Sequence, residues 1–217
     1  MIVGLVSPGE MGAAIGKLIG SDVVWCSEGR SAATRERAAS FRDVSRNELL
    51  RSDVLLSIVP PHAALDVARA TKGFEGMYVD ANAISPMHAR EIAAIHPRYV
   101  DGAIIGGPDD PQLYLSEDVL PNARVVHDPS ALKMAFAAWS KGSAAMLLAI
   151  ERVARHYGVW DELPWDEELR ERVARAHRSA ERKGWRWIGE MEEIADTFAA
   201  AGVPDGFHRA AAEVYRS

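Results

Sequence analysis

The first stretch of the sequence that could do chemistry is a glycine turn, Ser7-Pro8-Gly9-Glu10-Met11-Gly12. An apolar run with the composition of a buried strand precedes it, and a segment with apolar residues at helical spacing follows it. A strand that enters a helix through glycines leaves backbone N–H groups free at the helix N-terminus, where the helix dipole also favours an anion. The spacing is that of the dinucleotide fingerprint G-x-G-x-x-G, with serine in the first position. The turn therefore predicts a site for the pyrophosphate of a dinucleotide.

A second polar cluster follows the next expected strand, residues 23–26. It contains two arginines and two hydroxyl residues within six positions: Arg30, Ser31, Thr34 and Arg35. In a dinucleotide fold the adenosine ribose lies at this place, where guanidinium groups suit a 2′-phosphate and an acidic residue suits a free 2′-hydroxyl. The cluster favours NADP as the cofactor, and Glu28 leaves NAD as the alternative.

Two further segments come directly after expected strands. Residues 54–59 form a continuous apolar run that ends at a pair of prolines, and Val59 and Pro60 are candidates for contact with the ribose or nicotinamide of a cofactor. They would equally serve as a simple joint between a strand and a helix. Gly106 and Gly107 follow the expected strand 99–105, and they either let the backbone approach a ligand or only make a turn.

The elements that must position these residues change character near residue 128. Up to that point strand and helix patterns alternate, which predicts an α/β fold with a Rossmann-like, mostly parallel sheet. Beyond it the pattern is helical throughout, with expected helices over residues 130–157, 161–183, 185–200 and 203–215. We therefore expect a dinucleotide-binding domain over residues 1–128 and an all-helical domain over residues 129–217.

Composition narrows the function classes. The chain has 217 residues, of which 48% are hydrophobic and 26% charged, as in an ordinary globular protein. Its net charge of −6 argues against general binding to nucleic acid, and the scattered histidines and single cysteine, Cys26, do not suggest a metal site. No apolar stretch is long enough to span a membrane and no secretion signal is recognisable, so a cytoplasmic protein is expected.

Five motifs, in the order SPGEMG, VPP, DANAISP, DGAIIGG and SALKM, together resemble the β-hydroxyacid dehydrogenases and 6-phosphogluconate dehydrogenases. The segments GRSAATRERA, ALKMAFAAWSKG and RWIGEMEEIADTFAAAGVP are most similar to a little-characterised branch with its own helical C-terminal domain. The resemblance covers nearly the whole chain. It implies that the helical domain completes the active site and packs against a second subunit, so that the protein is a homodimer.

The resemblance also implies roles for individual residues. Residues 9–12 correspond to the phosphate-binding turn, Val59 and Pro60 to the loop beside the nicotinamide, and Gly106 and Gly107 to a substrate-binding segment. Asn82 stands where these enzymes usually have a serine that touches substrate or nicotinamide. Lys133 corresponds to their general acid/base lysine.

The residue types themselves are consistent with that role for Lys133. It lies in the first turn of an expected helix, where the dipole opposes a cation and favours a neutral amine. Such an amine could accept the proton of a hydroxyl group while hydride leaves the same carbon, although a solvated surface lysine is the alternative. Lys141 is a second candidate, because in a regular helix it lies about 80° round from Lys133. Ala137 replaces an asparagine of the well-studied enzymes, and we hypothesise that Asn82 and Lys141 supply the missing polar groups.

These observations predict an NADP-dependent oxidoreductase that transfers hydride between nicotinamide and a small hydroxy acid or a related carbonyl compound. Two alternatives stay open. One is an imine or ketone reductase of the same family, and the other is a non-catalytic NADP-binding or sensor protein that kept the fold and lost the chemistry.

Overall fold

The computed structural model describes residues 1–20 and 22–216. The chain divides into two compact units, Met1–Lys133 and Met134–Ser217, called here the N-terminal and C-terminal units. The division falls inside helix α6 (Pro129–Ala137). The sequence predicts a change from α/β to all-helical structure near the start of this helix. Each unit is described by itself.

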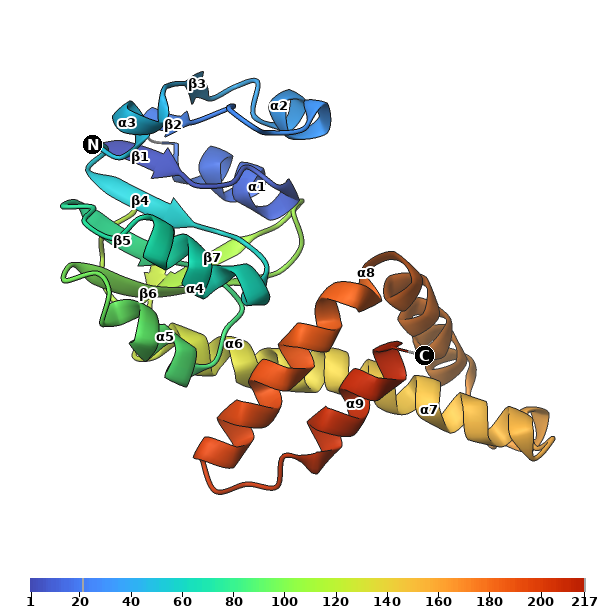
Figure 1. The fold of residues 1–217 in the computed structure, drawn as a ribbon. Helices are drawn as coiled ribbons and strands as arrows, with labels where there is room; N and C mark the ends of the chain where they lie inside the picture. The colour runs from blue at the N-terminus through green and yellow to red at the C-terminus, as the bar shows by residue number, and fades with distance from the viewer. Residues whose placement is uncertain (21, 217) are drawn as a thin grey trace. The chain divides into compact units, whose positions relative to one another are not determined.

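The N-terminal unit contains a sheet of eight strands in the order β3-β2-β1-β4-β5-β6-β7-β8 (Figure 1). The strands from β3 to β6 are all parallel, β7 runs antiparallel to β6, and β8 pairs parallel with β7. This confirms the predicted Rossmann-like fold class. The strands are β1 (Ile2–Leu5), β2 (Asp22–Trp25), β3 (Arg42–Asp43), β4 (Val54–Ser57), β5 (Met77–Asp80), β6 (Tyr99–Ile105), β7 (Gln112–Leu115) and β8 (Ala123–Val125).

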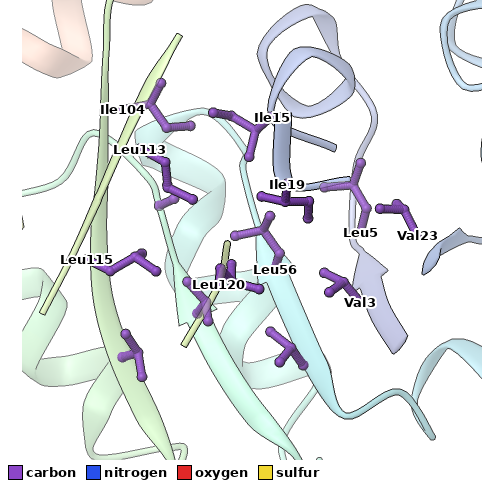
Figure 2. Packing of buried hydrophobic residues seen from close by; sticks show 14 residues of the cluster. Val3, Leu5, Ile15, Ile19, Val23, Leu56, Ile104, Leu113, Leu115 and Leu120 are labelled. Atoms are coloured by element: carbon purple, nitrogen blue, oxygen red, sulfur yellow. The ribbon is translucent and has the colours of Figure 1, made fainter. Parts of the chain in front are cut away.

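Helices cover both faces of the central strands, so the strands are apolar on both sides. Leu56 of β4 packs with Ile15 and Ile19 of α1 on one face (Figure 2), and its neighbour Leu55 packs with Ala68 of α4 on the other. Alternate residues of a strand point to opposite faces, which explains the continuous apolar run. The helices of this unit are α1 (Glu10–Ile19), α2 (Ala32–Arg37), α3 (Arg46–Leu49), α4 (Pro61–Ala70), α5 (Pro86–Ala93) and most of α6.

The strand order reverses between β1 and β4, because the chain first builds outward to β3 and then returns to the other side of β1. In open α/β sheets ligands bind outside the carboxyl ends of the strands at such a reversal. The carboxyl edge next to β1 and β4 is therefore the part of this unit where a ligand is expected.

The C-terminal unit is helical. A π-helical turn, η1 (Ala138–Gly142), follows α6 without a break and leads into α7 (Ser143–His156). The predicted helix over residues 130–157 is thus present, but the π turn inside it was not predicted. The remaining elements are the 3₁₀ turn η2 (Trp160–Glu162), α8 (Glu167–Ala200) and α9 (Gly206–Arg216).

Helix α8 corrects one prediction from the sequence. Residues 161–183 and 185–200 were expected to form two helices, whereas residues 167–200 form one helix that changes direction along its length (Figure 1). Gly184 does not end this helix. It is buried close to Ala180 and to Tyr215 of α9, so packing outweighs the roughly 1 kcal/mol by which glycine disfavours a helix interior.

Among the described residues, none of the helices is both long enough and apolar enough to cross a membrane. The same residues contain no group of three histidine, cysteine, aspartate or glutamate side chains that could hold a metal ion.

Candidate cofactor and catalytic site

The glycine turn joins β1 to α1, and its two glycines differ in the space around them. Gly9 occupies the N-cap position of α1, and a Cβ added there would meet no atom within 4 Å. A Cβ on Gly12 would lie 2.3 Å from the carbonyl oxygen of Ser7, so only glycine fits. Pro8 is buried, Glu10 is exposed in the first helical turn, and Met11 packs against the core. The turn is closed on its inner side and open where a ligand would approach.

The helix starts of this unit differ in how their first N–H groups are satisfied. Helices α2, α3 and α5 begin at serines whose hydroxyl groups accept a hydrogen bond from the helix backbone: Ser31, Ser45 and Ser85. In the described structure α1 and α4 begin at Gly9 and Pro60 and have no side-chain cap. These two helices follow β1 and β4, between which the strand order reverses. The uncapped N–H groups at the start of α1 fit the anionic part of a dinucleotide, whereas Pro60 and Pro61 at the start of α4 have no N–H to donate.

The predicted arginine cluster lies beside the glycine turn. Arg30 Nη2 donates a hydrogen bond of 3.0 Å to the carbonyl oxygen of Val6, at the end of β1, and Arg35 Nε donates to the carbonyl of Arg30. Ser31 Oγ caps α2 and lies 3.0 Å from Thr34 Oγ1. The four predicted residues are therefore gathered at the carboxyl ends of β1 and β2.

A cavity of about 240 Å³ opens next to Arg30. Glu28 lines the same cavity, so the acidic and the basic candidates for the ribose both face it. The other lining residues are Val6, Cys26, Arg46, Leu49, Leu50, Leu55 and Thr71. Its partly apolar lining is suited to an adenosine group.

Asn82 is buried, with 3% of its surface exposed, and its side chain is engaged within the protein. Its Oδ1 accepts a hydrogen bond of 2.6 Å from the backbone N–H of Val59, and its Nδ2 donates to Ser57 Oγ at 3.2 Å. Its own backbone N–H donates to Asp80 Oδ1 at 2.9 Å. Asn82 thus fixes the Val59–Pro60 loop after β4, a role that the sequence did not suggest.

Two aspartates lie opposite each other on neighbouring strands, Asp80 at the carboxyl end of β5 and Asp101 within β6. Burial raises the pKa of Asp80 to about 7, the hydrogen bond from Asn82 opposes this shift, and the nearby charge of Asp101 adds to it. Asp80 Oδ2 is buried without a hydrogen-bond partner among the described residues. Burial also raises the pKa of Asp101, while hydrogen bonds from Ser130 act in the opposite direction. The edge of the sheet therefore contains a carboxyl group that titrates near neutral pH.

Lys133 lies in α6 and reaches back to the end of β6. Its Nζ donates a hydrogen bond of 2.7 Å to the carbonyl oxygen of Ile104, and the side chain is half-buried. Gly106 follows with φ of 99°, and a Cβ there would lie 2.2 Å from the carbonyl oxygen of Asp110, so the turn requires glycine. Gly107 has open space around it. Because β1 and β6 run parallel in one sheet, the Lys133 amine lies at the same edge as the glycine turn.

Lys141 lies in the C-terminal unit, within the π turn η1. Its Nζ forms an ion pair with Glu190 of α8, and both side chains are largely buried, with 18% and 12% exposed. The predicted rotation of about 80° from Lys133 assumed a regular α-helix, and the π turn makes that assumption wrong. Glu190 could not be found from the sequence, because it lies 49 residues away.

Comparisons with known proteins agree with this fold. Residues 154–217 match a family model described as a domain of unknown function, DUF1932. An uncharacterized 28.5 kDa protein from Methanothermus fervidus is 30% identical over 191 residues, which cover 75% of this chain and 74% of that protein. A solved structure of a conserved protein of unknown function, described as similar to 3-hydroxyacid dehydrogenases, is 25% identical. The alignment of the two structures covers 100% of this chain and 96% of the other, with a TM-score of 0.69.

The chain belongs to this 3-hydroxyacid dehydrogenase-like family. The fold is also shared by an imine reductase from Myxococcus stipitatus in complex with NAD⁺, at 20% identity and a TM-score of 0.54, covering 100% of this chain and 92% of that one. A Synechocystis arogenate dehydrogenase shares it at 11% identity and a TM-score of 0.65, covering 93% and 88%. These structures share with this chain a Rossmann fold that is followed by a helical region.

Within this 3-hydroxyacid dehydrogenase-like chain, sequence reasoning missed several residues of the edge: Ser57, Asp80, Asp101 and Ser130. Asp80 stands at the end of β5, inside the DANAISP motif, and that position is the signal that could have identified it. Asp101 lies within β6 and only its pairing with Asp80 brings it to this place. The two serines carry no such signal, because only the tertiary structure brings them to Asn82 and Asp101.

Proposed function

We propose that this protein is an NADP-dependent oxidoreductase that transfers hydride between a nicotinamide and a small hydroxy acid or a related carbonyl compound, with Lys133 as general acid/base. The supporting observation is the position of the Lys133 amine. The Ile104 carbonyl holds it at the carboxyl edge of the sheet, at the edge that carries the open glycine turn. One group can thus handle a proton on the side of the sheet where a cofactor would bind.

Each part of the edge has one task in this proposal. A bound nicotinamide accepts or supplies the hydride. Lys133 Nζ takes the proton of the substrate hydroxyl in oxidation and returns it in reduction. The turn Ser7–Gly12 binds the pyrophosphate, Val59 and Pro60 form the wall beside the nicotinamide, and Gly106–Gly107 approach the substrate. Asn82 holds the Val59–Pro60 loop in place.

The preference for NADP is the finer part of the proposal. Arg30, Ser31, Thr34 and Arg35 offer guanidinium and hydroxyl donors to a 2′-phosphate at the end of β2. Fluorescence titration of NADPH and NADH measures the preference directly. Weaker binding of NADPH than of NADH, or an Arg30→Ala variant with unchanged NADPH affinity, would contradict the assignment.

The role of Lys133 is tested by Lys133→Ala, with the exposed Lys72→Ala as matched control. NADPH oxidation is followed by absorbance while hydroxy acids, aldehydes, ketones and imines are screened, with NADP⁺ reduction for the reverse direction. Loss of a general acid/base lowers turnover by roughly 100- to 10,000-fold, and NADPH affinity should stay within about twofold of wild type because Lys133 takes no part in phosphate binding. Unchanged turnover in Lys133→Ala would remove this residue from its role.

Imine or ketone reduction is the second candidate function. Ala137 is buried, with 1% of its surface exposed, where the resemblance expects a polar asparagine beside the lysine. The fold shared with imine reductases also agrees with this alternative. Turnover restricted to imines or simple ketones in the screen would select it. NADPH binding without any turnover would instead support a non-catalytic sensor.

We also propose that the helical domain, residues 129–217, forms a homodimer. Large apolar side chains are exposed at helical spacing along α7 and at its C-cap: Met146, Ile150, Val153 and, at the cap, Tyr157. A second copy of the chain would cover this stripe. Sedimentation velocity should show a dimer for wild type and a monomer for Val153→Glu, and a wild-type monomer at micromolar concentration would contradict the proposal.

A further inference from the structure

Two carboxylates meet the N-terminus of α6, and they act in different ways. Asp128 precedes the helix directly, and its Oδ1 accepts a hydrogen bond of 2.7 Å from the N–H of Ala131. Asp101 comes from β6. Its Oδ2 accepts from the N–H of Ser130 at 2.9 Å, and its Oδ1 accepts from Ser130 Oγ at 2.6 Å. Asp128 is therefore a local helix cap, whereas Asp101 ties the helix start to the sheet.

A second contact joins the same two elements. Lys133 Nζ donates to the carbonyl of Ile104, and this pair is separated by 29 residues in the chain, as is the pair of Asp101 and Ser130. The two contacts are therefore three residues apart on α6, from Ser130 to Lys133, which is about one helical turn. They are also three residues apart on β6, from Asp101 to Ile104. Two such points fix the position of the first turn of α6 along the strand, and any slide of the helix breaks both contacts.

The Asp101 contact consists of two hydrogen bonds from Ser130, whereas the Lys133 contact consists of one to Ile104. A carboxylate at a helix N-terminus also interacts favourably with the helix dipole. Asp101 is half-buried and its Oδ1 additionally accepts a weak hydrogen bond of 3.3 Å from the Tyr99 hydroxyl. Burial raises the pKa of this carboxyl, but the bonds from Ser130 favour its charged form.

We propose that Asp101 is a positioning residue for Lys133: by holding Ser130 it sets the place of the first turn of α6 on β6, and thereby the place of the Lys133 amine at the edge of the sheet. The inference rests on the proposed function in that Lys133 is taken as the general acid/base. Asp101 itself touches neither cofactor nor substrate in this scheme. Its effect passes through the helix start.

The direct test observes Lys133 without any substrate. Reductive methylation with ¹³C-formaldehyde gives each lysine a dimethylamine NMR signal, and Lys→Arg variants assign the signals. In wild type the Lys133 signal should be separate from those of the exposed Lys17 and Lys72. In Asp101→Ala it should move most of the way to their position, because the amine has left the Ile104 carbonyl. Ser130→Ala keeps one of the two bonds, so its signal should move part of the way.

Asp128→Ala is the matched control, since it also removes a carboxylate from the N-terminus of α6 but leaves the link to β6. Both variants should lower the unfolding temperature, and only Asp101→Ala should move the Lys133 signal. An unmoved signal in Asp101→Ala, or an equal movement in Asp128→Ala, overturns the proposal. If Asp101→Ala does not fold, the variants Ser130→Ala and Asp101→Asn replace it in the test. An unmoved Lys133 signal in both of these variants overturns the proposal.

Kinetics then separates this inference from the proposed function. Once the screen has given a turned-over compound, Asp101→Ala should lower kcat roughly tenfold to 100-fold, while the NADPH dissociation constant stays within about twofold. Asp128→Ala should keep kcat within about twofold. Full activity of Lys133→Ala contradicts the proposed function and leaves the NMR result intact. If Lys133→Ala loses turnover but Asp101→Ala keeps the wild-type kcat, only the positioning role of Asp101 is contradicted.

Discussion

The helix starts of the N-terminal unit follow two different rules. Helices α2 and α3 satisfy their first N–H groups with their own serines, Ser31 and Ser45, and α3 has a full capping box with Glu48. Helices α1 and α4, in the described structure, leave those groups without a side-chain cap. The two prolines at the start of α4 have no N–H to satisfy, so the open groups belong to α1. In our proposal the start of α1 is completed by a ligand, whereas the chain completes α2 and α3 by itself.

The same contrast extends to side chains at this edge of the sheet. Asp80 has one oxygen bonded to the backbone of Asn82 and one buried oxygen with no partner among the described residues. Ser52, by contrast, donates its hydroxyl hydrogen bonds to two backbone carbonyls within the fold. The Asp80 oxygen at the carboxyl end of β5 could meet a bound molecule.

The largest expected effect on cofactor binding comes from giving the open helix start of α1 a capping side chain. Gly9→Ser places a capping hydroxyl at the start of α1, whose backbone is extended there and accepts any residue. The new side chain fills the open space beside Gly9 and competes for N–H groups that would bind pyrophosphate. Loss of two such bonds to an anion weakens NADPH binding by about 100-fold, measured by fluorescence titration.

The stability of Gly9→Ser should not fall, although its binding of NADPH weakens. Gly9→Ser should be as stable as wild type or more stable by a few tenths of a kcal/mol, measured by urea unfolding. Gly189→Ser is the control, because Gly189 in α8 also has open surroundings. Unchanged NADPH binding in Gly9→Ser would show that the open start of α1 does not serve a cofactor.

The second effect is a pH dependence that arises from Asp80. Because burial raises its pKa in the folded state from 3.8 to about 7, the folded protein binds the proton more tightly than the unfolded chain. The stability from this group is fully present below pH 3.8 and is lost as the pH rises through 7. Asp80→Asn should remove this loss, which is on the order of 3 to 5 kcal/mol.

Urea unfolding of wild type and Asp80→Asn at pH 5, 6, 7 and 8 measures it. The free energies of unfolding of the two proteins should diverge as the pH rises, in favour of the asparagine variant. A difference that is constant over this range would show that the Asp80 carboxyl is not raised in pKa.

Asn82→Ala tests a polar group at the same edge of the sheet whose hydrogen bonds are satisfied within the protein. It leaves the backbone N–H of Val59 without its acceptor, which should lower the free energy of unfolding by about 1 to 3 kcal/mol and weaken NADPH binding. Ser57→Ala removes only the hydrogen bond that the Asn82 Nδ2 group donates to Ser57, and it should have the smaller effect. A variant that keeps its stability and NADPH affinity but loses turnover would instead make Asn82 a substrate contact, as the resemblance implies.

The smallest effect concerns a helix start that the chain completes by itself. Ser45→Ala removes the cap of α3 and should lower the free energy of unfolding by about 1 kcal/mol. NADPH affinity should not change, since this end binds no cofactor in our proposal. A parallel loss of NADPH affinity would mean that capped and open helix starts do not differ in function.

The sequence alone predicted what depends on neighbouring residues. Apolar runs and their spacing gave β6 at residues 99–105, the serine cap of α5 at Ser85, and the change to helices after residue 128. It also gave the shape of the glycine turn, since strand, turn and helix are adjacent in the chain. The roles of the predicted site residues stay predictions.

What only the tertiary structure decided are pairings between distant residues. Val59 and Asn82 are 23 residues apart, Asp101 and Ser130 are 29 apart, and Lys141 and Glu190 are 49 apart. Nothing in the local pattern selects one polar partner over another at such distances, because the choice depends on which strands and helices come to lie side by side. The π turn and the continuity of α8 through Gly184 have the same origin, since packing outweighs local preference. The sequence by itself thus determined the open helix start at Gly9, and the packing of β5, β6 and α6 decided how Asp101, Ser130 and Lys133 pair.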